Sequence, residues 1–159
     1  MLNAAATEGR AKMIDIIAFQ LGDQAFCVRT MAVREIRGWA PCTPLPHAPA
    51  DILGVMNLRG SIIPIVDLAA RLRMKSRVAT ERSAIVVTEI GDAVIGLLVE
   101  RVSDMLTVST DDIRPVPQMG SGVDTRFAEG IVSIESGMIC FLDLEAILGQ
   151  DDMQHFEAA

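Results

Sequence analysis

The sequence predicts an all-β protein made of two related halves, each with about five short strands. Short apolar runs alternate with glycine and proline turn signals along the chain, a pattern typical of barrels and sandwiches. Little of the sequence has the period of an amphipathic helix. In addition, a stretch near the middle of the chain is repeated, in the same order, near its end, which predicts a duplicated unit.

Composition excludes several classes of protein. The 159 residues can bury a sizeable core without disulfides or metals. A formal net charge of −7 argues against nucleic-acid binding, because phosphates require a basic face. We expect neither a signal peptide nor direct membrane insertion, since no apolar run approaches the ~20 residues of a membrane span. The cysteines Cys27, Cys42 and Cys140 are odd in number and widely spaced, which predicts reduced thiols in the cytosol.

The first half is predicted to end in a short helix. Its strands are expected at 14–21, 24–28, 30–38 (after a helical turn), 55–59 and 61–66. Residues 1–13 have no periodicity and are expected to form a flexible tail. The Gly22-Asp23 pair is typical of a hairpin turn, and residues 41–49 carry four prolines that predict an extended loop. Asp67 is expected to cap a helix over 68–72.

The second half is predicted to repeat this order. Its strands are expected at 84–90, 93–102, 105–108, 129–134 and 138–142. Residues 71–82 hold five of the fourteen basic residues and are expected to form a solvated linker between the halves. Residues 115–125 contain two prolines and two glycines and predict a loop. Asp143 is expected to begin a helix over 144–148 that Gly149 ends.

An alignment of the chain with itself supports the duplication. Residues 54–72 match residues 130–148 at an offset of 76. The matched pairs include a glycine, the helix-capping aspartate and the helix: Gly54 and Gly130, Asp67 and Asp143, Leu68 and Leu144. We therefore expect a first barrel at about 14–72 and a second at about 84–148. A half of that size is marginal by itself, which predicts that the two share one core in a domain over 14–150, followed by a tail at 151–159.

The two copies differ at polar positions. Arg59 in the first copy aligns with Glu135 in the second, and core packing cannot require both. Arg59 is therefore a candidate for a contact with a partner, because a guanidinium can bind a carboxylate or the carbonyls that end a helix. A structural ion pair with Glu35 or Asp67 is the alternative, and the sequence leaves both open.

Other positions near Arg59 have plainer interpretations. Asn57 is expected to satisfy buried backbone groups more often than to contact a partner. Val33 and Ile36 are expected to belong to the core.

Several short runs carry a family resemblance. They are Glu35-Ile36-Arg37-Gly38, then Pro44, then Gly54-Val55-Met56-Asn57-Leu58-Arg59-Gly60, then Pro64-Ile65-Val66-Asp67-Leu68, and Ile113-Arg114-Pro115 in the second half. In these runs the chain resembles the CheW-like domain family of chemotaxis coupling proteins. The likeness extends over about 14–150, and the central run is long and ungapped.

The resemblance implies two intertwined five-stranded SH3-like barrels that share a core, with short helices. It implies an adaptor with no catalytic residues, no cofactor and no metal. Such an adaptor couples the cytoplasmic tip of chemoreceptors to the regulatory domain of the histidine kinase CheA, and it is cytoplasmic and recruited to membrane-associated receptor arrays. The groove between the barrels receives the receptor tip in this family. Receptor contacts are carried over to Val33, Glu35, Gly54, Asn57, Leu58, Arg59 and Gly60, whereas the motifs leave the kinase contacts unknown.

The alternative hypothesis is a small β-barrel ligand-binding protein or enzyme. Its support is generic, since the carboxylates Asp67, Asp104 and Asp143 lie near apolar runs. A convergent set of acid, base or nucleophile would be needed for catalysis, and the sequence shows none.

Overall fold

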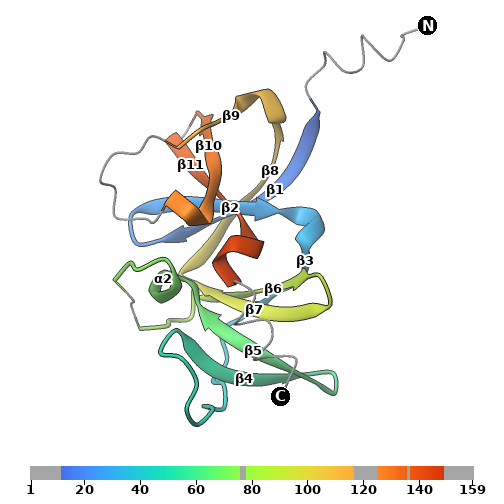
Figure 1. Ribbon diagram of the computed structural model, residues 1–159, viewed down its shortest axis with the longest axis vertical. Coiled ribbons are helices and arrows are strands. Elements are labelled where there is room, and N and C mark those ends of the chain that lie inside the picture. Colours follow the sequence, from blue (N-terminus) through green and yellow to red (C-terminus); the bar gives the residue numbers. More distant parts are fainter. Residues whose placement is uncertain (1–11, 76–77, 117–124, 136, 149–159) are drawn as a thin grey trace, which may run out of the picture.

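Two β-sheets, one at each end of the long axis, make up the molecule (Figure 1). The computed structural model describes residues 12–75, 78–116, 125–135 and 137–148. The strands of the described residues are β1 (Met13–Leu21), β2 (Gln24–Arg29), β3 (Val33–Gly38), β4 (Ile52–Leu58), β5 (Ser61–Asp67), β6 (Ala84–Ile90), β7 (Ala93–Val99), β8 (Arg101–Ser109), β9 (Ile113–Arg114), β10 (Ala128–Ile134) and β11 (Gly137–Leu142).

Helices are short and occur where the chain turns. They are η1 (Thr30–Ala32), α2 (Leu68–Arg71), η2 (Thr110–Asp112), η3 (Thr125–Phe127) and a helix over 144–148, here called the C-terminal helix. The all-β class with short helices is thus confirmed, as are the helical turn before β3 and the two helices that follow capping aspartates.

Each sheet combines strands from both halves of the sequence. One sheet has the order β8-β1-β2-β11-β10-β9 and the other β3-β6-β7-β5-β4; we call them the six-stranded and five-stranded barrels. The hairpin β1–β2 leaves the first half to pair with β8 and β11, and the hairpin β6–β7 leaves the second half to pair with β3 and β5. Two intertwined SH3-like barrels are therefore present.

The expected assignment of one barrel to each half, 14–72 and 84–148, differs from this arrangement. Turn signals identify the antiparallel hairpins, but two parallel pairings decide to which barrel a hairpin belongs. In these pairings Phe141 of β11 lies opposite Cys27 of β2, and Ile65 of β5 lies opposite Gly96 of β7. Both are contacts between residues far apart in the sequence, and no local pattern specifies them. The six-stranded barrel also gains the two-residue strand β9.

A central core lies between the barrels, and strands on either side of it are buried on both faces. On β2, Phe26 and Val28 belong to the central core, whereas Cys27 points into the six-stranded barrel. On β7, Leu97 belongs to the central core and Leu98 points into the five-stranded barrel. Successive strand residues face opposite sides, so one hairpin contributes to two apolar clusters. The predicted shared core is therefore present.

The duplication is visible in the local geometry. Gly22 and Gly91 have φ angles of 61° and 60° in equivalent hairpin turns. Asp67 Oδ1 accepts a hydrogen bond from Ala70 N at 3.4 Å, and Asp143 Oδ1 accepts one from Ala146 N at 3.2 Å. These bonds satisfy backbone donors at the start of each helix.

The expected linker 71–82 is only partly solvated. Arg71 is half-buried and is hydrogen-bonded to both halves of the chain, whereas Arg73 and Lys75 are exposed. Several other expectations lie outside the described residues: the tail over 1–11, most of the loop 115–125, the helix stop at Gly149 and the tail 151–159. Met13, placed in the tail, is the first residue of β1.

The cysteine thiols are free, as predicted. Cys27 lies on β2 and Cys140 on the neighbouring strand β11. Cys27 packs in the six-stranded barrel, whereas Cys140 packs against the central core. Burial, together with the neighbouring Cys140 and Glu129, raises the pKa of the Cys27 thiol from 9.0 to about 12.

We predict that Cys27 makes stability fall at alkaline pH. In the unfolded chain the thiol ionises near pH 9, but in the folded protein only near pH 12. Its contribution is therefore complete below pH 9 and is lost as the pH rises toward 12. Urea unfolding of the wild type and Cys27→Ala, with reductant, should show the wild type's advantage reduced by roughly 1 kcal/mol between about pH 8 and about pH 10. A difference that does not change with pH would contradict this.

We also predict that the barrels unfold in one transition, because the central core belongs to both. Leu97 is fully buried there, so Leu97→Ala should lower the free energy of unfolding by about 2–5 kcal/mol. Calorimetry of this variant should still show one peak shifted to lower temperature. Met105→Ala is the control, since Met105 is exposed and should change stability by less than about 0.5 kcal/mol. Two separate transitions would show that the barrels fold independently.

Candidate functional site

The turn between β4 and β5 carries most of the predicted receptor-contact residues. Leu58 pairs with Ser61, so Arg59 and Gly60 form a two-residue loop. Their φ angles are 52° and 91°; two positive values are what such hairpin loops require. Asn57 Oδ1 accepts a hydrogen bond from Gly60 N at 2.9 Å. Asn57 therefore binds a backbone donor, as expected, but the donor belongs to the exposed turn and not to buried backbone.

Arg59 reaches from this turn to β3. One of its guanidinium nitrogens lies 2.6 Å from a carboxylate oxygen of Glu35. β3 and β4 are the two edges of the five-stranded sheet, so the ion pair connects them. The Arg59 side chain is 76% exposed and that of Glu35 is 22% exposed. Since exposed ion pairs contribute less than about 1 kcal/mol, the pair orients the guanidinium more than it stabilises the barrel.

The ion pair borders a hollow of about 270 Å³ on the five-stranded barrel. Leu58, Ile63, Val87 and Val94 line it, together with Arg34, Glu35, Arg59 and Ser61. We call it the Arg59 hollow. It places a charged rim around an apolar floor, which suits a partner with both kinds of surface.

The structure brings five of the seven predicted residues together and separates two. Glu35, Asn57, Leu58, Arg59 and Gly60 lie at or beside the turn, with Leu58 buried beneath it.

Val33 is the first residue of β3, two residues before Glu35, and packs against the central core. It is half-buried, as is Ile36.

Gly54 is buried at the far end of β4, where another segment crosses it closely. A Cβ at this position would lie 2.2 Å from the carbonyl oxygen of Thr43. The equivalent Gly130 has the same constraint, since its Cβ would lie 2.6 Å from the carbonyl oxygen of Arg114. Both copies keep glycine for this close backbone approach, so Gly54 has a packing role that the resemblance did not reveal.

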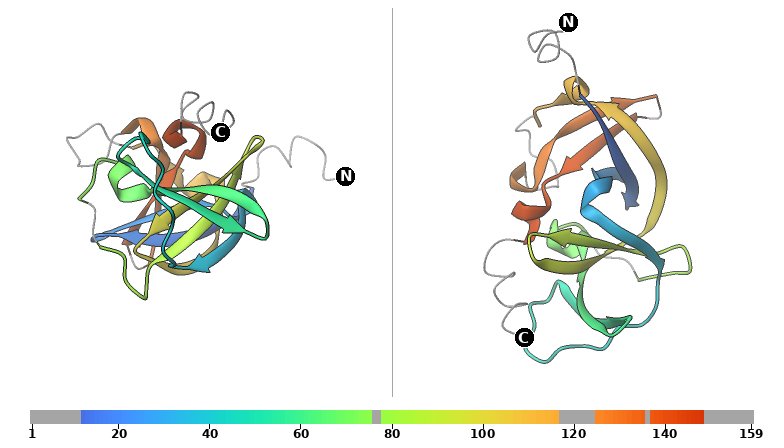
Figure 2. Two further views of the ribbon diagram at one scale, coloured as in Figure 1. Left: turned by 90° about the horizontal axis from the view of Figure 1, so that it is seen from below. Right: turned by 90° about the vertical axis from the view of Figure 1, so that its right-hand side faces the viewer.

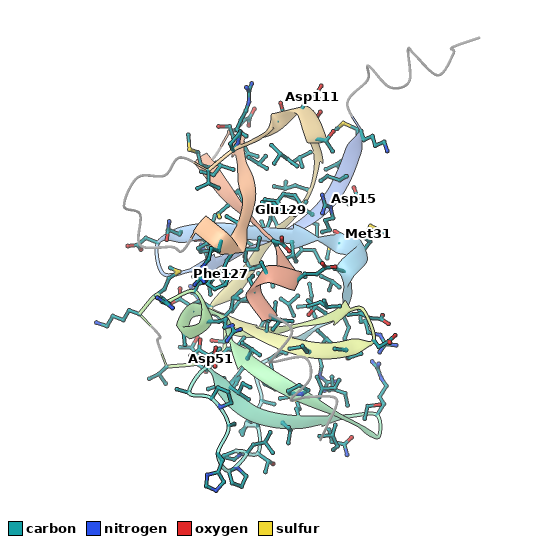
Figure 3. All side chains as sticks on the ribbon, viewed as in Figure 1. Asp15, Met31, Asp51, Asp111, Phe127 and Glu129 are labelled. Carbon is teal, nitrogen blue, oxygen red and sulfur yellow. The ribbon has the colours of Figure 1, made fainter. Side chains whose placement is uncertain are left out.

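A second hollow lies between the barrels, and we call it the interbarrel groove. Its volume is 350 Å³. Its walls come from both barrels and the C-terminal helix: Arg29, Ala32, Glu89, Ile90, Gly91, Glu129, Leu142, Asp143, Leu144 and Glu145. Four carboxylates and one guanidinium make it acidic. Figure 3 shows Glu129 near the junction of the barrels.

Arg29 and Glu129 were missed by sequence reasoning. They stand 100 residues apart, and their side chains approach to 3.3 Å across the six-stranded barrel. The Arg29 guanidinium also lies 5.0 Å from the centre of the Phe141 ring. No local signal could have paired them, because the strand pairing that joins β2 to β11 is itself long-range.

The interbarrel groove and the Arg59 hollow are connected along β3. Arg34, which lines the hollow, forms an ion pair of 3.6 Å with Glu89, which lines the groove. Ala32 of the groove directly precedes β3, and Glu35 of the hollow lies within it. A single surface therefore runs from the junction of the barrels to Arg59.

Two further features bear on chemistry. Within the described ranges, no three His, Cys, Asp or Glu side chains come together as a possible metal site. In the same part of the chain, no helix is long and apolar enough to cross a membrane.

Comparisons with known proteins agree on one family. A family model described as the CheW-like domain matches residues 15–152. The chemotaxis protein CheW of Rhizobium meliloti (strain 1021) is 51% identical over 140 residues, which cover 88% of this chain and 90% of that protein. The chemotaxis protein CheW of Klebsiella aerogenes is 31% identical over 139 residues, covering 87% and 84%. The crystal structure of the scaffolding protein TtCheW from Thermoanaerobacter tengcongensis has a TM-score of 0.81 at 28% identity, covering 91% and 93%.

The geometry of Gly54 predicts that its substitution destabilises the fold. Gly54→Ala would bring a Cβ against the Thr43 backbone and should lower the free energy of unfolding by about 2 kcal/mol or more. Gly60→Ala is the matched control. A Cβ there meets nothing within 4 Å, so only its left-handed backbone should matter, at about 1 kcal/mol. Equal stability of Gly54→Ala and the wild type in urea unfolding would contradict the packing role.

Proposed function

Since the chain belongs to the CheW-like domain family, we propose that it couples the cytoplasmic tip of chemoreceptors to the regulatory domain of the histidine kinase CheA. Family membership makes it a non-catalytic adaptor of chemotaxis signalling, so the alternative of a β-barrel enzyme is set aside. We propose in addition that its partners are the receptor tip and the kinase, and that it is a cytoplasmic protein recruited to receptor arrays. The receptor tip would bind along β3, from the interbarrel groove to the Arg59 hollow.

One observation carries this proposal, namely an arginine where the turn favours other residues. The left-handed conformation of Arg59, at φ 52°, suits glycine or asparagine and is unfavourable for a long side chain. The ion pair with Glu35 holds the guanidinium in place, yet it remains 76% exposed. The turn itself does not account for arginine, whereas a partner's carboxylate or helix-ending carbonyls would.

The shape of the surface fits a helical partner. An amphipathic helix binds by its apolar stripe in a groove and uses its polar flanks at the rim. The Arg59 hollow offers Leu58, Ile63 and Val87 as an apolar floor. The interbarrel groove continues this surface with Ile90 and Leu144. A hairpin tip could therefore contact both hollows at once.

Kinase binding is proposed for faces away from β3. The family resemblance implies separate barrel faces for the kinase's regulatory domain. An adaptor needs the two partners to bind together, so the two surfaces should not overlap.

We predict that Arg59→Ala weakens receptor binding and leaves the fold intact. Loss of a charge-assisted contact that is desolvated in the complex costs about 2–5 kcal/mol. The exposed pair with Glu35 contributes less than about 1 kcal/mol to the fold, so the melting temperature should change little. Calorimetric titration with a soluble receptor hairpin fragment and with the kinase regulatory domain should show strong loss for the receptor only.

Arg101→Ala is the matched control for this test. It removes the same charge from an exposed position on β8 that lines neither hollow of the proposed site, and should leave receptor binding unchanged. An equal loss of binding affinity for both partners in Arg59→Ala, or a large drop in its melting temperature, would show that Arg59 stabilises the barrel instead. Unchanged receptor binding would contradict the proposed site.

A further inference from the structure

Arg71 connects the first half of the chain to the end of the second. It is the last residue of α2, and its side chain is 23% exposed. Its Nε donates a hydrogen bond to the Ile147 carbonyl at 2.5 Å, and a terminal nitrogen donates to the Leu148 carbonyl at 3.3 Å. The other terminal nitrogen lies 2.9 Å from Asp51 Oδ2. One guanidinium therefore spans three acceptors from two distant segments.

Asp51, the carboxylate partner of this guanidinium, is itself held in place. The Asp51 carbonyl accepts a hydrogen bond of 2.8 Å from Asp67 N, at the start of α2. The Asp51 carboxylate is 15% exposed, so its pair with Arg71 is little screened by solvent. Arg71 is thus held by the first half of the chain and, at the same time, bonded to the second half.

The C-terminal helix depends on such contacts. It has five residues (144–148), too few for a helix to be stable by itself. Its last carbonyls have no donors within the helix, and a cation at this end also interacts favourably with the helix dipole. Leu144 and Ile147 anchor one side of the helix in the central core, and Arg71 binds its end.

This helix lies between the two barrels (Figure 2), and it forms a wall of the interbarrel groove. Leu144 and Glu145 line the groove, whereas Ala146 lines a separate hollow of 530 Å³ that also contains Arg71 and Asp51. Arg71 does not line the groove. It binds the last carbonyls of the helix from the separate hollow that Ala146 also lines.

We propose that Arg71 is a positioning residue for partner binding in the interbarrel groove. Its two hydrogen bonds to the last carbonyls hold the C-terminal helix in place. The helix in turn sets the shape of the groove for the receptor hairpin. The inference rests on the proposed function for its partner, but its structural part can be tested without one. In the second copy the equivalent position is Ile147. The first copy therefore has a guanidinium at this position, and the second copy has no charged side chain there.

The first experiment is native-state hydrogen exchange of Arg71→Ala, read at the amides of Ala146 and Ile147. Both amides are hydrogen-bonded to Asp143 and report the C-terminal helix. Exchange should be about tenfold faster or more, since bonds to a charged donor are lost, while β6 and β7 amides keep their protection. Arg73→Ala removes the same charge from an exposed residue of the same hollow and should leave these amides unchanged. Wild-type protection of Ala146 and Ile147 in folded Arg71→Ala would overturn the inference.

The second experiment measures binding of a soluble receptor hairpin fragment. Folded Arg71→Ala should bind about tenfold more weakly, with Arg73→Ala equal to the wild type. Arg71→Lys keeps the charge but cannot fork to both carbonyls; it should fall between the two and serves as the readout if the alanine variant does not fold. If the wild type does not bind the fragment, the proposed function fails, and if the wild type and Arg59→Ala bind it equally, the proposed site fails. If Arg59→Ala is impaired but folded Arg71→Ala binds as the wild type, the positioning role alone is overturned.

Discussion

The apolar core between the two barrels is the constraint on which the rest of the structure depends. Phe26 and Val28 of β2 face it from one barrel, and Val86 and Leu97 face it from the other. Strand side chains alternate between two faces. One face of these strands packs in the central core and the other packs inside a barrel. Neither half of the chain has enough apolar surface to form such a layer by itself. Exchange of the hairpins β1–β2 and β6–β7 gives each half a share of both barrels.

This shared core also creates the candidate site. When two barrels meet, their rims leave a groove whose walls come from both, and the C-terminal helix fills the junction beside it. β3 runs from that junction to the Arg59 turn, so side chains from both halves of the sequence reach one surface. A partner bound there would contact both barrels at once.

The duplicated unit keeps its symmetry in the fold and breaks it on the surface. Gly54 and Gly130 are retained for the same close backbone approach, and Asp67 and Asp143 cap equivalent helices. Arg59 and Arg71, in contrast, align with Glu135 and Ile147. Backbone geometry constrains the first group in both copies. The second group makes contacts that only one copy has. The two copies therefore differ in the surfaces that they offer to a partner.

The sequence by itself determined the elements and several of their details. Glycine turns, capping aspartates and apolar alternation are local signals, so the hairpins, the two capped helices and the duplication were predicted correctly. The expected strands 93–102 and 105–108 were wrong in their boundary, because residues 101 and 102 belong to the continuous strand β8. The same local logic anticipated that Asn57 binds backbone groups and that Arg59 could pair with Glu35. The resemblance to a family indicated intertwined barrels, which composition and periodicity could not.

Only the tertiary structure decided which hairpin belongs to which barrel, because the parallel pairings of β2 with β11 and β5 with β7 join residues far apart in the chain. It also showed that Arg71, expected in a solvated linker, is half-buried and bridges both halves of the chain, and that Gly54 has a packing role. The pair of Arg29 with Glu129 had no sequence signal at all. Each of these depends on two segments meeting in space, and alternation along one segment carries no information about its distant neighbour.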